Sequence, residues 1–214
     1  MNSIKRPARL RADAVKYVRC KNLVAVLEEP FDLVNIGTVV RNVDALGVSK
    51  TYIVDPKKSL PDDWFEMRDK HALSKTSVGA IKWSFVKRFD STEHCLEHLE
   101  ANHFTSVVTS PHVKGKSNHV LHTADYTTPK KLAVWFGNES RGISDLAVER
   151  SEFCISIPMA GMVESLNLAV STGIVLYEVT KQRRAYQLEH WRALQQKRLN
   201  LHTDADQASS GSLS

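Results

Sequence analysis

The sequence predicts an α/β domain built on a parallel sheet with helices on both faces. Short apolar runs of strand length recur along the chain, at residues 23–27, 50–54, 104–109, 131–136 and 154–157. Continuous runs of this kind are typical of strands that are covered on both sides. Segments between them, such as residues 35–48 and 92–102, place apolar residues at helical spacing. A strand, a helix and a strand in that order favour right-handed parallel crossovers.

The remaining elements are less regular. We expect one helix over residues 62–73, a short strand over 83–85, a surface loop over 112–122 and a short helix over 145–150. Gly47 is expected to cap the end of the helix at 35–48. Ser165 is expected to cap the start of the helix that follows the last strand.

Charge and cysteine content limit the classes of function. The chain has 29 lysines and arginines against 24 acids, and its net charge of +5 permits nucleic-acid binding without requiring it. The three cysteines show neither disulfide nor zinc spacing. His94 and His98 are four residues apart, but an exposed helical face explains them better than a zinc site does, so we expect no metal. No apolar run is long enough for a membrane span, and the first residues are too charged for a signal peptide. A cytoplasmic protein with reduced thiols is expected.

Basic segments flank the α/β body, which the sequence places at residues 22–180. Residues 1–21 predict a basic N-terminal helical extension, and residues 181–202 predict a basic helix that also carries Tyr186 and Trp191. Either helix could be solvated, and the second could instead pack on the body or on another subunit. RNA binding is the alternative, with candidate contacts at Arg9, Arg11, Arg183, Arg184 and Arg192. Residues 203–214 lack apolar content and are expected to be disordered.

Three loops follow predicted strands and are candidates for a ligand site. They begin at Ser110-Pro111, at Gly137 and at Pro158, and the last two contain glycine among polar residues. Ligands of open α/β sheets bind beyond the carboxyl ends of the strands, so these loops should converge on one site. Neither a dinucleotide-binding glycine motif nor a P-loop motif is present, so the ligand must be held in another way.

Three strings resemble the SpoU/TrmH family of the SPOUT class of RNA methyltransferases: NIGTVVRNVDALG, FGNESRGIS and IPMAGMVESLNLAVSTGIVLYE. The resemblance extends from about residue 23 to residue 184, and MAGMVESLN is similar to the tRNA guanosine-2′-O-methyltransferase branch. It implies S-adenosylmethionine as methyl donor and an RNA ribose 2′-hydroxyl as acceptor. It also implies a homodimer and a C-terminal deep trefoil knot, which general connection rules would not predict. The two basic helices are similar to that branch's RNA-binding extensions.

The resemblance also implies site residues, position by position. Arg41 matches the catalytic arginine, Asn35 the asparagine of the first motif and Glu139 the glutamate of the second, while Ser165 and Asn167 match the polar pair of the third. Cofactor contacts are expected at Thr109, Ser110, Gly137, Ile157, Met159 and Leu166. The sequence departs from many relatives at Asn42, where a small residue usually follows the arginine.

An arginine is a poor proton acceptor, because its pKa lies above about 12. Our hypothesis is that Arg41 binds an RNA phosphate and the 2′-oxygen together and stabilises the developing alkoxide. The leading function is methylation of tRNA, at a D-loop guanosine, and ribosomal RNA is the nearest alternative. A non-catalytic RNA-binding or assembly factor on the same fold is the alternative from another class. A small-molecule methyltransferase conflicts with the basic helices.

Overall fold

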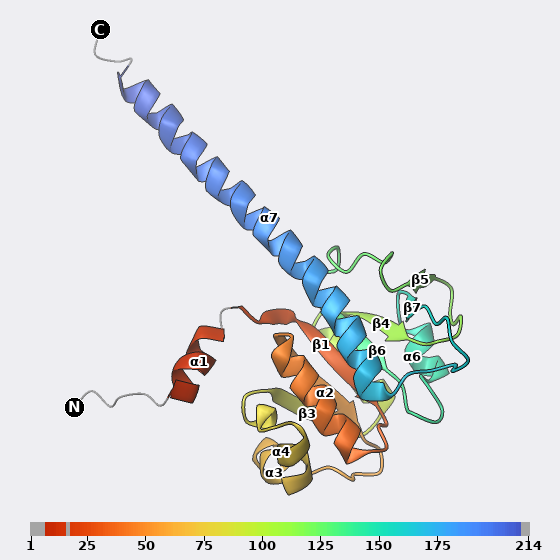
Figure 1. The fold of residues 1–214 in the computed structure, drawn as a ribbon. Helices are drawn as coiled ribbons and strands as arrows, with labels where there is room; N and C mark the ends of the chain where they lie inside the picture. Colours follow the sequence, from red (N-terminus) through yellow and green to blue (C-terminus); the bar gives the residue numbers. More distant parts are fainter. Residues whose placement is uncertain (1–6, 16–17, 211–214) are drawn as a thin grey trace, which may run out of the picture.

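Seven strands form one parallel sheet at the centre of the protein (Figure 1). The structure, a computed structural model, describes residues 7–15 and 18–210 of the 214-residue chain. The strands are β1 (Cys20–Glu28), β2 (Val48–Val54), β3 (Phe85–Phe89), β4 (Thr105–Thr109), β5 (Asn118–Val120), β6 (Leu132–Phe136) and β7 (Cys154–Ser156). Their order across the sheet is β3-β2-β1-β6-β4-β7-β5, and each described strand pair is parallel. The predicted parallel α/β fold is confirmed.

Helices connect the strands and extend the chain beyond them. They are α1 (Pro7–Val15), α2 (Leu33–Ala45), α3 (Trp64–Asp69), α4 (His71–Thr76), the 3-10 helix η1 (Ala80–Lys82), α5 (Thr92–Ala101), α6 (Asp145–Glu149) and α7 (Leu168–Ser210). Figure 1 shows α1 to one side of the sheet and α7 extending far beyond it. At about 1.5 Å per residue, the 43 residues of α7 span roughly 65 Å.

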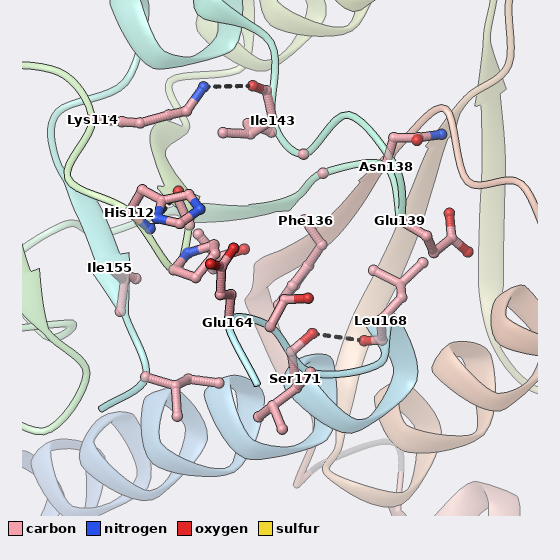
Figure 2. Close-up of a pocket in the computed structure, with 18 of the residues that line it drawn as sticks. His112, Lys114, Phe136, Asn138, Glu139, Ile143, Ile155, Glu164, Leu168 and Ser171 are labelled. Atoms are coloured by element: carbon pink, nitrogen blue, oxygen red, sulfur yellow. Dashed lines mark hydrogen bonds between the residues drawn. The ribbon is translucent and has the colours of Figure 1, made fainter. Parts of the chain in front are cut away.

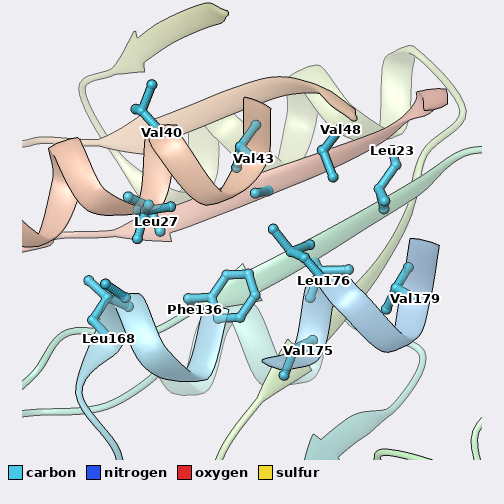
Figure 3. Close-up of a cluster of buried hydrophobic side chains, with 14 of the residues drawn as sticks. Leu23, Leu27, Val40, Val43, Val48, Phe136, Leu168, Val175, Leu176 and Val179 are labelled. Atoms are coloured by element: carbon cyan, nitrogen blue, oxygen red, sulfur yellow. The ribbon is translucent and has the colours of Figure 1, made fainter. Parts of the chain in front are cut away.

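Alternate residues of β1 belong to two separate apolar cores. Leu23, Ala25 and Leu27 pack in a cluster with residues of α2, α4 and α7, whereas Val24 and Val26 pack in a cluster with residues of α5 and α6. Successive strand side chains point to opposite faces, so a strand buried on both faces is apolar throughout. Figure 3 shows the first cluster, in which α2 and α7 lie side by side over β1 and β6. Burying each large apolar side chain contributes about 1.5–3 kcal/mol.

Local signals fix the ends of α2. The Asp32 side chain caps its start by accepting a hydrogen bond from the Val34 amide at 2.8 Å. Leu46 is the C-cap, and Gly47 follows it with φ of +71°, a conformation that glycine adopts without strain. The predicted helix end is therefore one residue from the observed one. This exact placement matters because α2 carries both Asn35 and Arg41.

Two predictions for the strands were wrong. The expected loop at 112–122 contains β5, whose three residues pair with β7 at an edge of the sheet. Its side chains are partly or fully exposed, so no apolar run marks it. The strand expected at 83–85 begins at Phe85 and continues to Phe89. Arg88 interrupts its apolar pattern and forms ion pairs with Asp62 and Asp90.

The helix predictions need corrections as well. The helix expected over 62–73 divides into α3 and α4 at Lys70, whose ψ of 109° is extended. Ser165 does not cap α7, because Asn167 accepts hydrogen bonds from the Ala169 and Val170 amides at 2.9 and 3.3 Å. The part of the predicted N-terminal helix that falls on residues 1–6 and 16–17 lies outside the described residues.

The C-terminal part of the chain is one helix. α7 passes residue 180 without a break and continues to Ser210. The expectation of disorder from residue 203 was wrong for residues 203–210. Extending an existing helix costs much less than nucleating one, which allows a polar sequence to continue the helix. Residues 211–214 lie outside the described part of the chain.

Candidate active site

Three loops at the carboxyl edge of the sheet enclose a pocket of about 280 Å³ (Figure 2). They follow β4, β6 and β7, which are neighbours in the sheet, so the loops meet although they are distant in sequence. The pocket is lined by all six residues predicted to contact the cofactor, Thr109, Ser110, Gly137, Ile157, Met159 and Leu166, and also by Glu139 and Ser165. The three loops therefore converge on one pocket, as the sequence predicted.

The pocket joins an apolar interior to polar groups. Phe136, Ile155, Leu168 and Val175 line it from β6, β7 and α7, and all four are buried. Polar lining comes from the loops, with Ser110 buried and Glu164 exposed. A pocket that is mainly apolar with a few placed polar groups is typical of sites for cofactors and small molecules. This combination fits S-adenosylmethionine, which has an apolar adenine ring beside a cationic sulfonium and charged amino-acid groups.

The loop after β6 folds tightly on itself. The amides of Asn138 and Gly142 each donate to the other residue's carbonyl oxygen, at 2.9 and 2.8 Å. The Asn138 side chain accepts from the Ser140 and Arg141 amides. A Cβ atom on Gly137 would lie 2.2 Å from the Ile143 nitrogen and 2.3 Å from the Gly142 carbonyl carbon. Because these are backbone atoms, only glycine fits there, and the pocket wall depends on it.

The same loop is fastened to the rest of the domain by a buried carboxylate. Glu28, at the end of β1, is 3% exposed and accepts hydrogen bonds from the hydroxyls of Thr92 and Ser144, each at 2.6 Å. It also accepts from the Ser144 amide at 2.8 Å. Ser144 in turn caps α6. Glu28 thereby fixes the end of the loop, and because no local motif marks this role, the sequence analysis missed it.

A chain of hydrogen bonds joins the three motifs. Asn167 donates from Nδ2 to Asn35 Oδ1 at 3.0 Å, and Asn35 donates from Nδ2 to Glu139 Oε1 at 2.9 Å. The Phe31 amide donates to Glu139 Oε2 at 3.0 Å. Because Asn167 Oδ1 already accepts from the first turn of α7, the orientation of each amide in this network is determined. The structure thus brings Asn35, Glu139 and Asn167 together.

The hydrogen bonds also set the charge of Glu139. Partial burial acts to raise the pKa of this carboxyl, but the donors at Asn35 and the Phe31 amide outweigh it and hold the pKa below its ordinary value. A depressed pKa stabilises the fold above the unfolded-state pKa, and this stabilisation is lost as the pH falls through the folded-state pKa. The network should therefore persist at neutral pH and open only in acid.

Asn35→Ala should raise the pKa of Glu139 toward its ordinary value, because the largest donor is removed. Titration of the Glu139 side-chain carbon by ¹³C NMR would measure this change. Thr38→Ala, on the same helix and without a hydrogen bond to Glu139, is the matched control. An unchanged Glu139 pKa in Asn35→Ala would contradict the network.

Arg41 is not among the residues that line the pocket. It is exposed on α2, and no hydrogen bond or ion pair joins it to another residue in the described part of the chain. It follows Asn35 by six positions, which places the two side chains about 120° apart around the helix axis. A shallow groove between α2 and α7 lies on the Asn35 side and is lined by Asn35, Thr38, Asn42, Asn167, Ala169, Val170, Gly173 and Ile174. Asn42, the residue that departs from many relatives, donates to the Ala169 carbonyl at 2.8 Å and so ties α2 to α7.

The predicted RNA contacts have different environments. Arg11 is exposed on α1, Arg192 is exposed on α7, and Arg184 is exposed but donates to the Leu46 carbonyl at 2.7 Å. Arg9 lies on α1. The prediction that Arg183 contacts RNA was wrong, because only 8% of this residue is exposed. Its guanidinium donates to the carbonyls of three residues in the segment before β6, Tyr126, Pro129 and Lys130. Arg183 therefore fixes this segment to α7 and presents no charge to an RNA.

Arg183→Ala should destabilise the protein by at least about 3 kcal/mol, because each charged hydrogen bond contributes about 1.5–3 kcal/mol and three carbonyls would lose their donor, in one buried and two partly buried hydrogen bonds. Urea unfolding would measure the loss. Arg184→Ala, which removes one exposed hydrogen bond from the adjacent position, is the control and should cost about 1 kcal/mol or less. Equal stabilities of the two variants would contradict this role.

Further lining residues were not predicted from the sequence. His112 and Lys114 lie on the loop after β4, and Lys114 donates to the Ile143 carbonyl at 3.2 Å across the pocket (Figure 2). Lys114 is also 3.6 Å from the Asp145 carboxylate. Their position just after the carboxyl end of β4 is the feature of the sequence that could have identified them as lining residues. Within the described residues, no group of three acids, histidines or cysteines is arranged to hold a metal, and no helix is long and apolar enough to cross a membrane.

A pocket closed by loops at the carboxyl ends of adjacent parallel strands is the site of a cofactor-dependent α/β enzyme. The family model described as the SpoU rRNA Methylase family matches residues 22–177. The chain is 30% identical over 175 residues to the tRNA (guanosine(18)-2′-O)-methyltransferase of Thermus thermophilus, and the match covers 82% of each protein. The protein belongs to the SpoU family.

Solved structures are similar as well. A TrmH/SpoU tRNA modifying enzyme from A. aeolicus has a TM-score of 0.68 and 28% identity, and the match covers 84% of this chain and 85% of that one. An AdoMet-bound rRNA methyltransferase from Sinorhizobium meliloti has a TM-score of 0.64 and 25% identity, and covers 78% of this chain and 59% of that one. The resemblance identified from the three motifs is confirmed.

Proposed function

We propose that the protein transfers a methyl group from S-adenosylmethionine to a ribose 2′-hydroxyl of RNA, with a D-loop guanosine of tRNA as the leading substrate. The observation that carries the proposal is the single pocket in which the second and third motifs meet, joined by hydrogen bonds to the first. The relative from Thermus thermophilus supports the tRNA assignment.

The chain's own residues would hold the cofactor in the pocket of three loops. Gly137, Ile157 and Leu166 supply wall and backbone groups, Ser110 and Thr109 close it from β4, and Met159 contributes from the loop after β7. When bound, S-adenosylmethionine supplies an electrophilic methyl group on a sulfonium sulfur. The loops would exclude water from the bound cofactor and would fix the direction from which a 2′-oxygen can approach.

Arg41 is the residue we assign to the acceptor. Its guanidinium is exposed and without a partner among the described residues, so it is available to bind a phosphate and the 2′-oxygen together. Because arginine keeps its proton, its contribution is electrostatic stabilisation of the developing alkoxide. Asn35, Glu139 and Asn167 position the surrounding loops through their hydrogen bonds, and Ser165 lines the pocket.

We further propose a homodimer formed through the groove between α2 and α7. Large apolar side chains are exposed on these two helices, at Val34, Val170, Ile174 and Tyr177. Exposed apolar patches of this kind mark protein interfaces. Light scattering should give twice the chain mass, and Ile174→Glu should give the mass of one chain. A wild-type protein that remains monomeric would exclude the dimer.

The trefoil knot is also a proposal. It is supported by the similarity to SpoU structures and by the strand order, in which β6 lies between β1 and β4. The segment before β6 is held against α7 by Arg183 and by Gln182, which donates to the Ala124 carbonyl. Pulling both ends of a single molecule should leave the chain shorter than its contour length of about 3.6 Å per residue, because a knot tightens and retains residues. Full extension would exclude the knot.

We also propose a role for the two terminal helices. The helices α1 and α7 would bind RNA through Arg11, Arg184 and Arg192, in addition to the α/β body at residues 22–180. We expect a cytoplasmic protein, and the three free, buried cysteines are compatible with a reducing compartment. Ribosomal RNA is the second candidate substrate, favoured by the AdoMet-bound rRNA methyltransferase among the similar structures.

Transfer of labelled methyl groups to unmodified tRNA and rRNA transcripts tests the function. Incorporation into tRNA at a ribose 2′-oxygen supports the leading substrate, and incorporation into rRNA alone would replace it with the second candidate. Cofactor binding without incorporation into either RNA would favour a non-catalytic RNA-binding or assembly factor on the same fold.

A further inference from the structure

Basic residues line the amino-terminal edge of the sheet, opposite the pocket. Lys21 lies at the start of β1 and Lys50 at the start of β2. Lys82 precedes β3, and Lys130 and Lys131 precede β6. Arg19 lies just before β1. We call Arg19, Lys21, Lys50, Lys82, Lys130 and Lys131 the basic rim.

The sheet places these residues next to one another. The strands on which they lie or which they precede are consecutive in the order β3-β2-β1-β6, and neighbouring strands are about 4.8 Å apart, so the rim extends roughly 15 Å along the edge. α7 adds to it, because Arg184 donates to the Leu46 carbonyl and lies beside Gly47, which leads into β2. The rim thus connects the body to the extended helix.

The rim has an excess of positive charge. Arg19 is paired with Asp44, Lys131 donates to the Asn102 carbonyl, and Lys50 lies 6.0 Å from the centre of the Phe85 ring. Lys21, Lys82 and Lys130 are exposed, and their ammonium groups have no hydrogen bond or ion pair with any described residue. Acids occur instead at the carboxyl ends of the same strands, at Glu28, Asp55 and Asp90. The unpaired lysines give the rim a positive potential.

An aromatic side chain accompanies the lysines. Trp83 follows Lys82 and is 48% exposed, and the Arg19 guanidinium donates to its carbonyl oxygen at 3.2 Å. Exposed lysines bind phosphates, and an exposed indole can stack on an unpaired base. The chemistry of the rim therefore complements RNA.

We propose that the basic rim is a second RNA-binding surface, which contacts the phosphate backbone of the substrate far from the methylated ribose. From Lys21 to Glu28 the strand rises about 3.3 Å per residue, so rim and pocket are roughly 23 Å apart. An RNA must be folded and large to reach both, which makes the enzyme selective for an intact structured RNA over a short hairpin. This inference rests on the proposed function.

The test is a triple variant, Lys21→Gln with Lys82→Gln and Lys130→Gln. Its matched control is Lys57→Gln with Lys58→Gln and Lys75→Gln, which removes three exposed lysines away from the rim. Filter binding of a full-length tRNA transcript should show about a tenfold higher Kd for the rim variant only. The slope of log K against log salt should become less steep by about 2–3, as expected for three lost phosphate contacts. Trp83→Ala should weaken binding more than Phe65→Ala, a control at another exposed aromatic residue.

Activity and a short hairpin substrate complete the test. In methyl transfer, the rim variant should have a raised KM for tRNA, with kcat and S-adenosylmethionine affinity unchanged. It should bind a short hairpin that contains only the loop with the methylated ribose as tightly as the wild type does. Equal Kd values for the rim and control variants would overturn the proposal. A rim-dependent Kd in a protein that methylates no RNA would support the rim and refute the proposed function.

Discussion

Arg41→Ala is expected to lower the rate of methyl transfer to RNA by at least about 10²-fold, the loss typical when one donor to a developing oxyanion is removed. The side chain is exposed and has no partner among the described residues, so its removal leaves no buried group unsatisfied. Folding and cofactor affinity should therefore be unchanged. Single-turnover transfer of labelled methyl, with calorimetric titration of S-adenosylmethionine, would separate the rate from binding.

Arg41→Lys distinguishes charge from geometry. A lysine keeps the positive charge but cannot form the planar, two-pronged contact with phosphate and 2′-oxygen. It should remain strongly impaired. Near-normal turnover of Arg41→Lys would refute the two-pronged contact, and normal turnover of Arg41→Ala would remove Arg41 from the mechanism.

Gly137→Ala is expected to weaken S-adenosylmethionine binding by at least about 10²-fold, since a displacement of about 1 Å in a positioned site can have an effect of this size. The new Cβ would lie 2.2 Å from the Ile143 nitrogen and 2.6 Å from the Gly142 carbonyl oxygen. The loop must open to relieve these contacts, which moves the pocket wall. Calorimetric titration with S-adenosylmethionine would measure the affinity.

Gly161→Ala is the matched control, because a Cβ there has no atom within 4 Å and the residue does not line the pocket. Thermal unfolding of both variants would separate local opening from general destabilisation, which overpacking typically brings at about 1–3 kcal/mol. Unimpaired cofactor binding in Gly137→Ala would show that this loop does not form the binding site.

Prediction from sequence was most successful where one segment carries its own signal. The apolar runs of β1, β2, β4, β6 and β7 mark strands that are buried on both faces, and the second and third motifs occupy two of the three loops that enclose the pocket. It was less successful where an element depends on its neighbours. β5 is defined only by its pairing with β7, and α7 continues through polar residues because it extends an existing helix.

The functions of single polar residues also depended on distant contacts. Arg183 and Arg184 are adjacent arginines in a basic segment, yet one is buried against three carbonyls and the other is exposed. Ser165 was the expected cap of α7, but Asn167 has the position from which its oxygen reaches the first free amides. Neither distinction is present in the local sequence.

The sequence by itself determined the parallel α/β body, the three loops that form the pocket and the family to which the chain belongs, because strand burial and motif residues are local properties. Only the tertiary structure decided that Asn35, Glu139 and Asn167 form one hydrogen-bonded network and that lysines on or just before four neighbouring strands form one rim. Both results follow from the order of the strands. A parallel sheet makes neighbours of segments that are about 100 residues apart in the sequence. The order of the strands across the sheet cannot be read from the local sequence.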